Sequence, residues 1–205
     1  MTLDAGPTAV VAGKRERTKQ ANRTAILDAA RVVFADIGYG AASVRDIVRG
    51  TDLATGTFYN YFPDKESVLT ALLDETAGEA RLRVRAARRG GTTLDAFVRD
   101  GFRAYFDFLI EDRATSALLS RNAGTIRALF DEPYLVAGVE ELAEDLRAGV
   151  EAGLIPDHDV EYMAASMVGA AFEVGARMLD SAQPDPARAT EFISGLFIAG
   201  LSARG

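Results

Sequence analysis

The spacing of apolar side chains predicts α-helices along most of the chain. Apolar residues recur three and four positions apart, which is the period of one helix face, whereas strand-like alternation is scarce. The first such stripe contains Ile26, Ala30, Phe34 and Ile37, and Gly38 follows it. The pattern therefore predicts an all-α fold.

Capping residues and helix breakers divide this pattern into nine helices. Ser43 suits the N-cap of a short second helix, residues 50–54 suit a tight turn, and a third short helix covers 55–61 before Pro63. The other predicted helices cover about residues 64–90, 92–109, 113–130, 133–152, 157–180 and 187–203.

Composition narrows the chemistry that the chain can perform. It has 205 residues, 48% of them apolar, which is enough to bury a sizeable core. It has no cysteine and one histidine, His158, which excludes disulfide frameworks, thiolate metal sites and histidine clusters. Residues 64–205 also lack a Ser-His-Asp set and a Gly-rich phosphate loop. We therefore expect no enzyme, no metal and no cofactor.

The termini and the apolar runs bear on location. No uninterrupted apolar stretch reaches the roughly 18 residues that a membrane span needs. The first 13 residues contain Asp4 and have no basic segment before their apolar part, unlike a signal peptide. We expect a disordered N-terminal arm over residues 1–18 and a cytoplasmic protein.

The charge is unevenly distributed. The net charge is −7, yet residues 1–62 carry eight Lys and Arg against six Asp and Glu. The excess is densest at Lys14, Arg15, Arg17, Lys19 and Arg23. Two interpretations remain: a small anion-binding module on an acidic body, or a basic arm that only contacts solvent.

Two short helices joined by a turn over residues 43–61 are typical of a helix-turn-helix, whose second helix enters the major groove of DNA. Gly56 allows close approach of the backbone to DNA, and Thr55 and Thr57 offer hydroxyls to phosphates or base edges.

The aromatic residues of this stretch divide into two groups. Phe58 and Phe62 are four positions apart, so they share one helix face and are expected to point into the core. Tyr59 and Tyr61 are expected to point outward and donate their hydroxyls to phosphate oxygens. The alternative is that all four rings are core residues.

The residues Thr57, Tyr59, Tyr61, Phe62 and Lys65 follow the pattern T-x-Y-x-[YH]-F-x-x-K. With the preceding short helix, this stretch resembles the TetR family of one-component transcriptional regulators over about residues 20–70. The resemblance implies a helix-turn-helix DNA-binding domain over residues 19–63 and a helical ligand-binding and dimerisation domain over 64–205.

By position, the resemblance implies a DNA-binding face made by Ser43, Val44, Arg45, Thr55, Gly56, Thr57, Tyr59, Asn60, Tyr61 and Lys65. The turn departs from the family, which often has Ala-Gly-Val-Ser where this chain has Thr51-Asp52-Leu53-Ala54. Asp52 then has to tolerate the turn conformation of a glycine, and Thr55 is expected to replace Ala54 as the helix cap.

An aromatic stripe at residues 97–108 leaves two interpretations open, a filled core or the wall of a ligand pocket. For a pocket, the candidate ligand-binding residues are Phe102, Tyr105, Phe106, Arg121, Asn122, Phe130 and Phe172. The expected effector is a largely apolar small molecule, for example one with a carboxylate or an acyl chain. Arg121 or Arg127 would neutralise an anionic end.

Small residues are frequent in the last two predicted helices. These are Ala164, Ala165, Gly169, Ala170, Ala171, Gly175, Gly195, Ala199 and Gly200. Such a surface lets a partner helix come close, and it predicts a homodimer through these two helices.

These expectations combine into a ligand-responsive regulator, a repressor that binds a palindromic DNA operator as a dimer and is released by its effector. One alternative is a helical ligand-binding or interaction protein without DNA binding. Another is a small enzyme that uses the apolar cavity. A mobility shift with promoter DNA tests the first alternative, and turnover assays on apolar metabolites test the second.

Overall fold

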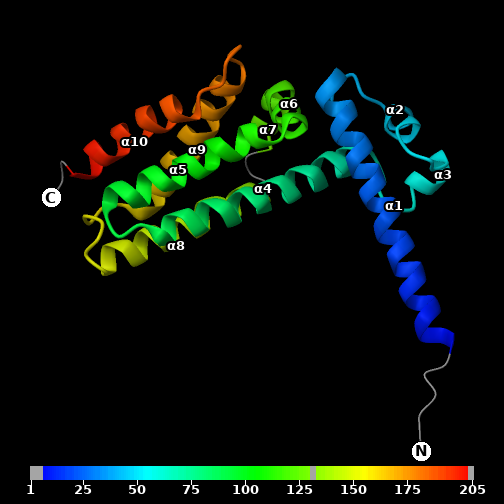
Figure 1. Ribbon diagram of the computed structural model, residues 1–205, viewed down its shortest axis with the longest axis horizontal. Helices are drawn as coiled ribbons and strands as arrows, with labels where there is room; N and C mark the ends of the chain where they lie inside the picture. The colour runs from blue at the N-terminus through cyan, green and yellow to red at the C-terminus, as the bar shows by residue number, and fades with distance from the viewer. Residues whose placement is uncertain (1–6, 130–132, 203–205) are drawn as a thin grey trace, which may run out of the picture. The chain divides into compact units, whose positions relative to one another are not determined.

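The computed structural model describes residues 7–129 and 133–202, and over these residues the chain forms ten helices and no strand (Figure 1). The all-α prediction is confirmed. The chain divides into two compact units, Met1–Leu72 and Leu73–Gly205. The division falls within helix α4 (Lys65–Gly90), which begins in the first unit and continues in the second. None of the described helices has the length and apolar character needed to cross a membrane.

Helix α1 (Pro7–Ile37) begins well before the predicted start of helical structure. Pro7 suits the first turn of a helix, because an N–H there would have no intrahelical acceptor. Two side chains bond back to the preceding turn, Arg17 Nε to Gly13 O at 3.1 Å and Thr18 Oγ1 to Lys14 O at 3.0 Å. From residue 7 to residue 18 the structure is therefore helical where a disordered arm was predicted.

The first unit packs the short helices α2 (Val44–Arg49) and α3 (Thr55–Phe58) beside the C-terminal half of α1 (Figure 1). Its fully buried side chains are Ile26, Ala30, Phe34, Ile47, Phe58, Val68 and Leu72. Gly50 ends α2 against α1, where an added Cβ would lie 3.0 Å from the Cβ of Ala29. A glycine at this position lets the two helices approach closely.

In the second unit, α5 (Leu94–Glu111) packs on α9 (Val160–Leu179) and α10 (Pro186–Ser202), and α8 (Pro133–Glu151) packs on α9. Thr93 caps α5 by accepting a hydrogen bond from Ala96 N. The shared core contains Phe97, Phe102, Phe106, Leu146, Met167 and Ile193. The aromatic stripe of α5 therefore faces the interior of this unit.

The predicted helix over residues 113–130 is two helices, α6 (Arg113–Arg121) and α7 (Ala123–Arg127). Asn122 separates them, with its side-chain Nδ2 donating to Leu118 O at 2.7 Å. This bond satisfies a carbonyl at the end of α6 and stops the helix, because asparagine competes with the backbone for such bonds. The described part of the chain thus has ten helices where nine were predicted.

Candidate functional site

Helix α2 begins with a capping box. Asp46 N donates to Ser43 Oγ at 3.3 Å, and Ser43 N donates to Asp46 Oδ2 at 3.0 Å. Hydrogen bonds from Ser43 hold the pKa of the Asp46 carboxyl below its usual value. Val44 is half-buried and Arg45 is exposed. The side chain of Ser43 therefore caps α2, while Arg45 presents its charge to solvent.

The turn between α2 and α3 is shaped by a threonine. Thr51 Oγ1 donates to Val48 O at 2.9 Å and accepts from Leu53 N at 3.2 Å. Among the described residues only glycines have positive φ, so Asp52 does not take the left-handed conformation of a turn glycine. Ala54 lies at the N-cap of α3 without a side-chain bond, so the predicted cap by Thr55 is wrong.

Helix α3 exposes a small polar surface. Thr55, Gly56, Tyr59 and Asn60 are exposed, with 55% of Tyr59 accessible, and an added Cβ at Gly56 would meet no atom within 4 Å. The helix is shorter than predicted, but bonds from Asn60 N to Thr57 O and from Tyr61 N to Phe58 O continue the coil as turns. The backbone at Gly56 is thus open to a partner.

Phe58 and Phe62 hold this surface in place. Both rings are buried in the first unit, with their centroids 6.2 Å apart, and Arg23 lies over the Phe62 ring at 5.6 Å. This confirms that the phenylalanines point inward. The interpretation of all four aromatics as core residues is wrong, because Tyr59 points into solvent.

Tyr61 and Thr57 are half-buried. The Tyr61 hydroxyl accepts a hydrogen bond from Asn22 Nδ2 of α1 at 3.0 Å. A hydroxyl that accepts one bond still has its own O–H to donate. Asn22 therefore orients Tyr61 and leaves its O–H able to donate, a contribution from α1 that sequence analysis missed.

Lys65 differs from its predicted role. Its Nζ donates to the carbonyls of Tyr39 at 2.8 Å, Ala42 at 2.9 Å and Gly40 at 3.5 Å, and lies 4.4 Å from the centre of the Tyr39 ring. An ammonium has three N–H donors, and these carbonyls accept them. In this structure Lys65 fixes the loop between α1 and α2 and does not present its charge to a phosphate.

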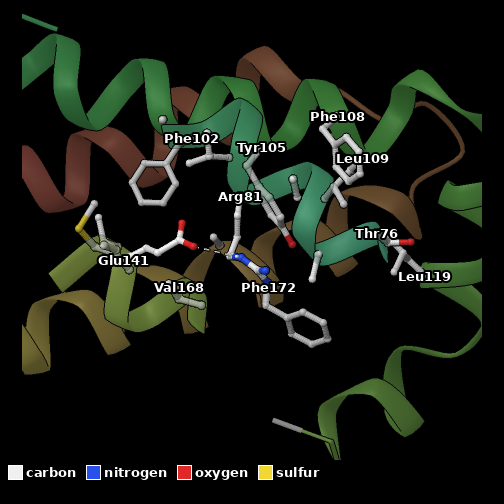
Figure 2. Close-up of a pocket in the computed structure, with 18 of the residues that line it drawn as sticks. Thr76, Arg81, Phe102, Tyr105, Phe108, Leu109, Leu119, Glu141, Val168 and Phe172 are labelled. Atoms are coloured by element: carbon white, nitrogen blue, oxygen red, sulfur yellow. Dashed lines mark ion pairs between the residues drawn. The ribbon is translucent and has the colours of Figure 1, made fainter. Parts of the chain in front are cut away.

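The second unit contains a cavity of about 190 Å³ (Figure 2). Most of its wall is apolar, and the residues come from α4, α5, α6, α7, α8 and α9. The cavity exceeds the roughly 150 Å³ of an engineered apolar cavity that binds benzene. Of the two interpretations of the aromatic stripe, the structure therefore supports a hollow core rather than a filled one.

Three of the predicted ligand-binding residues line the cavity: Phe102, Tyr105 and Phe172. Burial raises the pKa of the Tyr105 hydroxyl, so it stays a neutral hydrogen-bonding group. Phe106 is fully buried behind the wall, stacked on Phe102 with the centroids 6.4 Å apart. The Phe106 prediction was wrong because residues of one stripe differ in depth, which spacing alone does not show.

The predicted polar contacts lie elsewhere. Arg121 is exposed, Asn122 bonds to Leu118 O, and neither lines the cavity. Arg127 makes two surface bonds to Glu173, at 2.7 and 2.8 Å. Phe130 lies outside the described residues.

The polar side chains that do line the cavity were missed by sequence analysis: Thr76, Arg81, Arg88 and Glu141. The available signal was the run of arginines at the end of the predicted fourth helix. Arg81, Arg85 and Arg88 are spaced four and three apart, which places them on one helix face.

Helices α9 and α10 expose apolar and small residues together. Tyr162, Phe192 and Leu196 are exposed, and an added Cβ at Gly169, Gly195 or Gly200 would meet no atom within 4 Å. Other members of the predicted small-residue surface, Ala164, Ala171 and Gly175, face the core instead.

Comparison with known proteins agrees with this geometry. A family model described as "Bacterial regulatory proteins, tetR family" matches residues 26–72. The HTH-type transcriptional repressor KstR2 of Rhodococcus jostii (strain RHA1) is 34% identical over 90 residues, which are 42% of this chain and 44% of that protein. The chain therefore matches less than half the length of this curated relative.

Solved structures resemble the chain over most of its length. The fatty acid degradation regulator FadR from Bacillus halodurans has a TM-score of 0.73 and 26% identity, covering 87% of this chain and 95% of that chain. FadR from Bacillus subtilis, in complex with stearoyl-CoA, has a TM-score of 0.74 and 23% identity, covering 86% and 98%. The helix-turn-helix geometry and the family match show that residues 26–72 form a helix-turn-helix domain of the tetR family of bacterial regulatory proteins, and the solved neighbours share the fold of most of the chain.

Proposed function

We propose that the protein is a repressor that binds a palindromic operator as a homodimer and leaves it when a largely apolar small molecule binds. The observation that carries the proposal is the exposed surface of α3, supported from beneath by Phe58 and Phe62. The similarity to a named repressor, KstR2, supports the sign of regulation.

The DNA-binding domain is residues 19–63, and the surface facing DNA includes Arg45, Thr55, Gly56, Tyr59 and Asn60. Arg45 neutralises phosphate charge, and the hydroxyl and amide groups read base edges or bond to phosphates. Thr57 and Tyr61 contribute from the edge of this surface. Ser43 supports it by capping α2, Val44 by packing half-buried on α2, and Lys65 by bonding to the loop between α1 and α2.

Residues 64–205 bind the effector and form the dimer. The apolar wall around Phe102, Tyr105 and Phe172 favours a hydrocarbon ligand, because burying apolar surface gains about 25 cal/mol per Å². The FadR relatives are named for fatty acid degradation or were solved with stearoyl-CoA, which agrees with an apolar effector.

The dimer forms through α9 and α10, whose exposed apolar residues and open glycines suit a two-fold helical interface. Effector binding beside α4 changes the separation of the two recognition helices, since α4 continues into the DNA-binding unit. Half-sites lie roughly 34–36 Å apart on DNA, so a changed separation lowers affinity.

The proposal is tested by fluorescence anisotropy with DNA from the promoter of the protein's own gene. We expect wild type to bind this DNA far more tightly than scrambled DNA of equal length, and Tyr59→Ala to weaken promoter binding by roughly 10-fold or more. Thermal unfolding serves as the control, because an exposed side chain contributes little to stability. Equal affinity for both DNAs would overturn the proposal.

A further inference from the structure

A ladder of charges joins α4 and α8, and three of its members, Arg81, Arg88 and Glu141, line the cavity. Arg81 Nε lies 3.5 Å from Glu141 Oε1, Arg88 Nη2 lies 2.7 Å from Asp145 Oδ2, and Arg85 Nε lies 4.0 Å from Asp145 Oδ1. The three arginines share one face of α4 and the two carboxylates share one face of α8. Within the part of the chain that the structure describes, this ladder has one more positive than negative charge.

Arg88 is fixed in the ladder. Its Nε and Nη2 both bond to Asp145 Oδ2, at 3.1 and 2.7 Å, and its guanidinium lies 6.0 Å from the centre of the Phe97 ring. Gly101 of α5 makes room for its stem, because an added Cβ there would lie 2.9 Å from Arg88 Cγ. The side chains of Arg88 and Asp145 are only 9% and 12% exposed, so this pair is structural.

The pair of Arg81 and Glu141 is looser and more open. Its side chains are 25% and 30% exposed, its nitrogen–oxygen distance of 3.5 Å is longer than the 2.7 Å between Arg88 and Asp145, and both residues line the cavity. Figure 2 shows this ion pair among the apolar lining residues, on the same cavity as Phe102, Tyr105 and Phe172. A guanidinium binds oxyanions through paired N–H donors, so a ligand anion can replace the Glu141 carboxylate.

We infer that the effector carries one oxyanionic group, such as a carboxylate or a phosphate, and that Arg81 binds this group in exchange for Glu141. The apolar wall binds the rest of the molecule. A cationic effector is disfavoured, because it would meet the excess positive charge of the ladder. This inference rests on the proposed apolar effector and adds the chemistry of its polar end, which sequence analysis assigned to Arg121 or Arg127.

Calorimetry on the full-length protein tests the inference with three probes of equal chain length: octanoate, 1-octanol and octylamine. At neutral pH octanoate is an anion and octylamine a cation. We expect octanoate to bind at least about 10-fold more tightly than 1-octanol, because a charge-assisted bond to Arg81 adds to the same apolar contact. Octylamine should bind more weakly than 1-octanol.

Two variants and a control assign the effect. Arg81→Gln should abolish the preference for octanoate and leave 1-octanol binding unchanged, whereas Glu141→Gln should strengthen octanoate binding several-fold by removing the competing carboxylate. Arg103→Gln is the control, because it also removes one positive charge, but from the exposed face of α5, where Arg103 pairs with Asp107 at 2.8 Å. It should change neither octanoate binding nor 1-octanol binding.

The outcomes separate this inference from the proposed function. If 1-octanol binds as tightly as octanoate, or if Arg81→Gln keeps the preference, the oxyanion inference is overturned and the apolar effector stands. If octylamine binds more tightly than 1-octanol, the oxyanion inference is likewise overturned and the apolar effector stands. If none of the three probes binds or releases promoter DNA, the apolar effector and this inference are both overturned.

Discussion

Two cationic side chains of the first unit differ in their surroundings. Lys65 gives its donors to carbonyls of the loop between α1 and α2, whereas Arg45 is exposed on α2. The family resemblance places both on the DNA side, because a resemblance records residue type and position but not hydrogen-bond partners. The structure separates a lysine that fixes a loop from an arginine that is open to phosphate.

This difference predicts opposite behaviour for two matched variants. Lys65→Met should lower the free energy of unfolding by roughly 1–2 kcal/mol, because charge-assisted bonds to carbonyls are lost, and weaken DNA binding without changing its salt dependence. Arg45→Met should leave stability unchanged and reduce the slope of log affinity against log salt by about one per protomer. Thermal unfolding and salt titrations of DNA binding measure both effects.

A lower salt slope for Lys65→Met, with unchanged stability, would restore the predicted phosphate contact and contradict the loop-fixing role. An unchanged slope for Arg45→Met would remove Arg45 from the DNA-binding surface.

At the scale of helices, local periodicity predicted most of what the structure contains. The burial of Ile26, Ala30 and Phe34 and the inward phenylalanines follow from spacing along one helix, whereas Ile37 at the end of the same stripe is 42% exposed. The start of α1 at Pro7 was not predictable in this way, because the polar run from Lys14 to Gln20 separates its first turns from the apolar stripe that begins at Ile26.

The cavity was only partly predictable for a related reason. The aromatic stripe of α5 indicated which side chains face inward, and Phe102 and Tyr105 do line the cavity. The partner of Arg81 is on α8, far along the chain, and no spacing rule joins the two helices. Contacts between distant elements depend on packing, which the pattern of one helix does not contain.

Two glycines test how the helix-turn-helix is assembled. Gly50 lies at the close crossing of α2 and α1, whereas Gly56 is open on α3. Gly50→Ala should destabilise the protein by roughly 1–3 kcal/mol, because its Cβ is forced against Ala29. Gly56→Ala should keep or raise stability, since alanine favours helix, yet weaken promoter binding by blocking backbone approach to DNA.

Thermal unfolding and anisotropy on the same samples decide this comparison. If Gly56→Ala loses stability, Gly56 packs against other residues and is not open on α3. If promoter binding is unchanged, Gly56 lies away from the DNA.

At the scale of the whole molecule, the proposed dimer explains an otherwise unfavourable surface. Phe192 and Leu196 of α10 are exposed beside open glycines, and contiguous apolar surface of this kind usually marks an interface. Leu82 of α4 is also exposed but lies outside the proposed interface, so it provides a control of the same residue type.

Leu196 is 60% exposed and Leu82 is 73% exposed in one copy of the chain, so replacing either by glutamate should leave the fold intact. Leu196→Glu should weaken the dimer by about 100-fold or more, because the interface would bury an unpaired charge from each protomer. Leu82→Glu should leave the dimer unchanged. Sedimentation equilibrium at micromolar protein measures the dimer affinity of both variants. Operator affinity should fall as the dimer weakens, because the dimer binds two half-sites together. A dimer that survives Leu196→Glu and dissociates with Leu82→Glu would move the interface from α10 to α4.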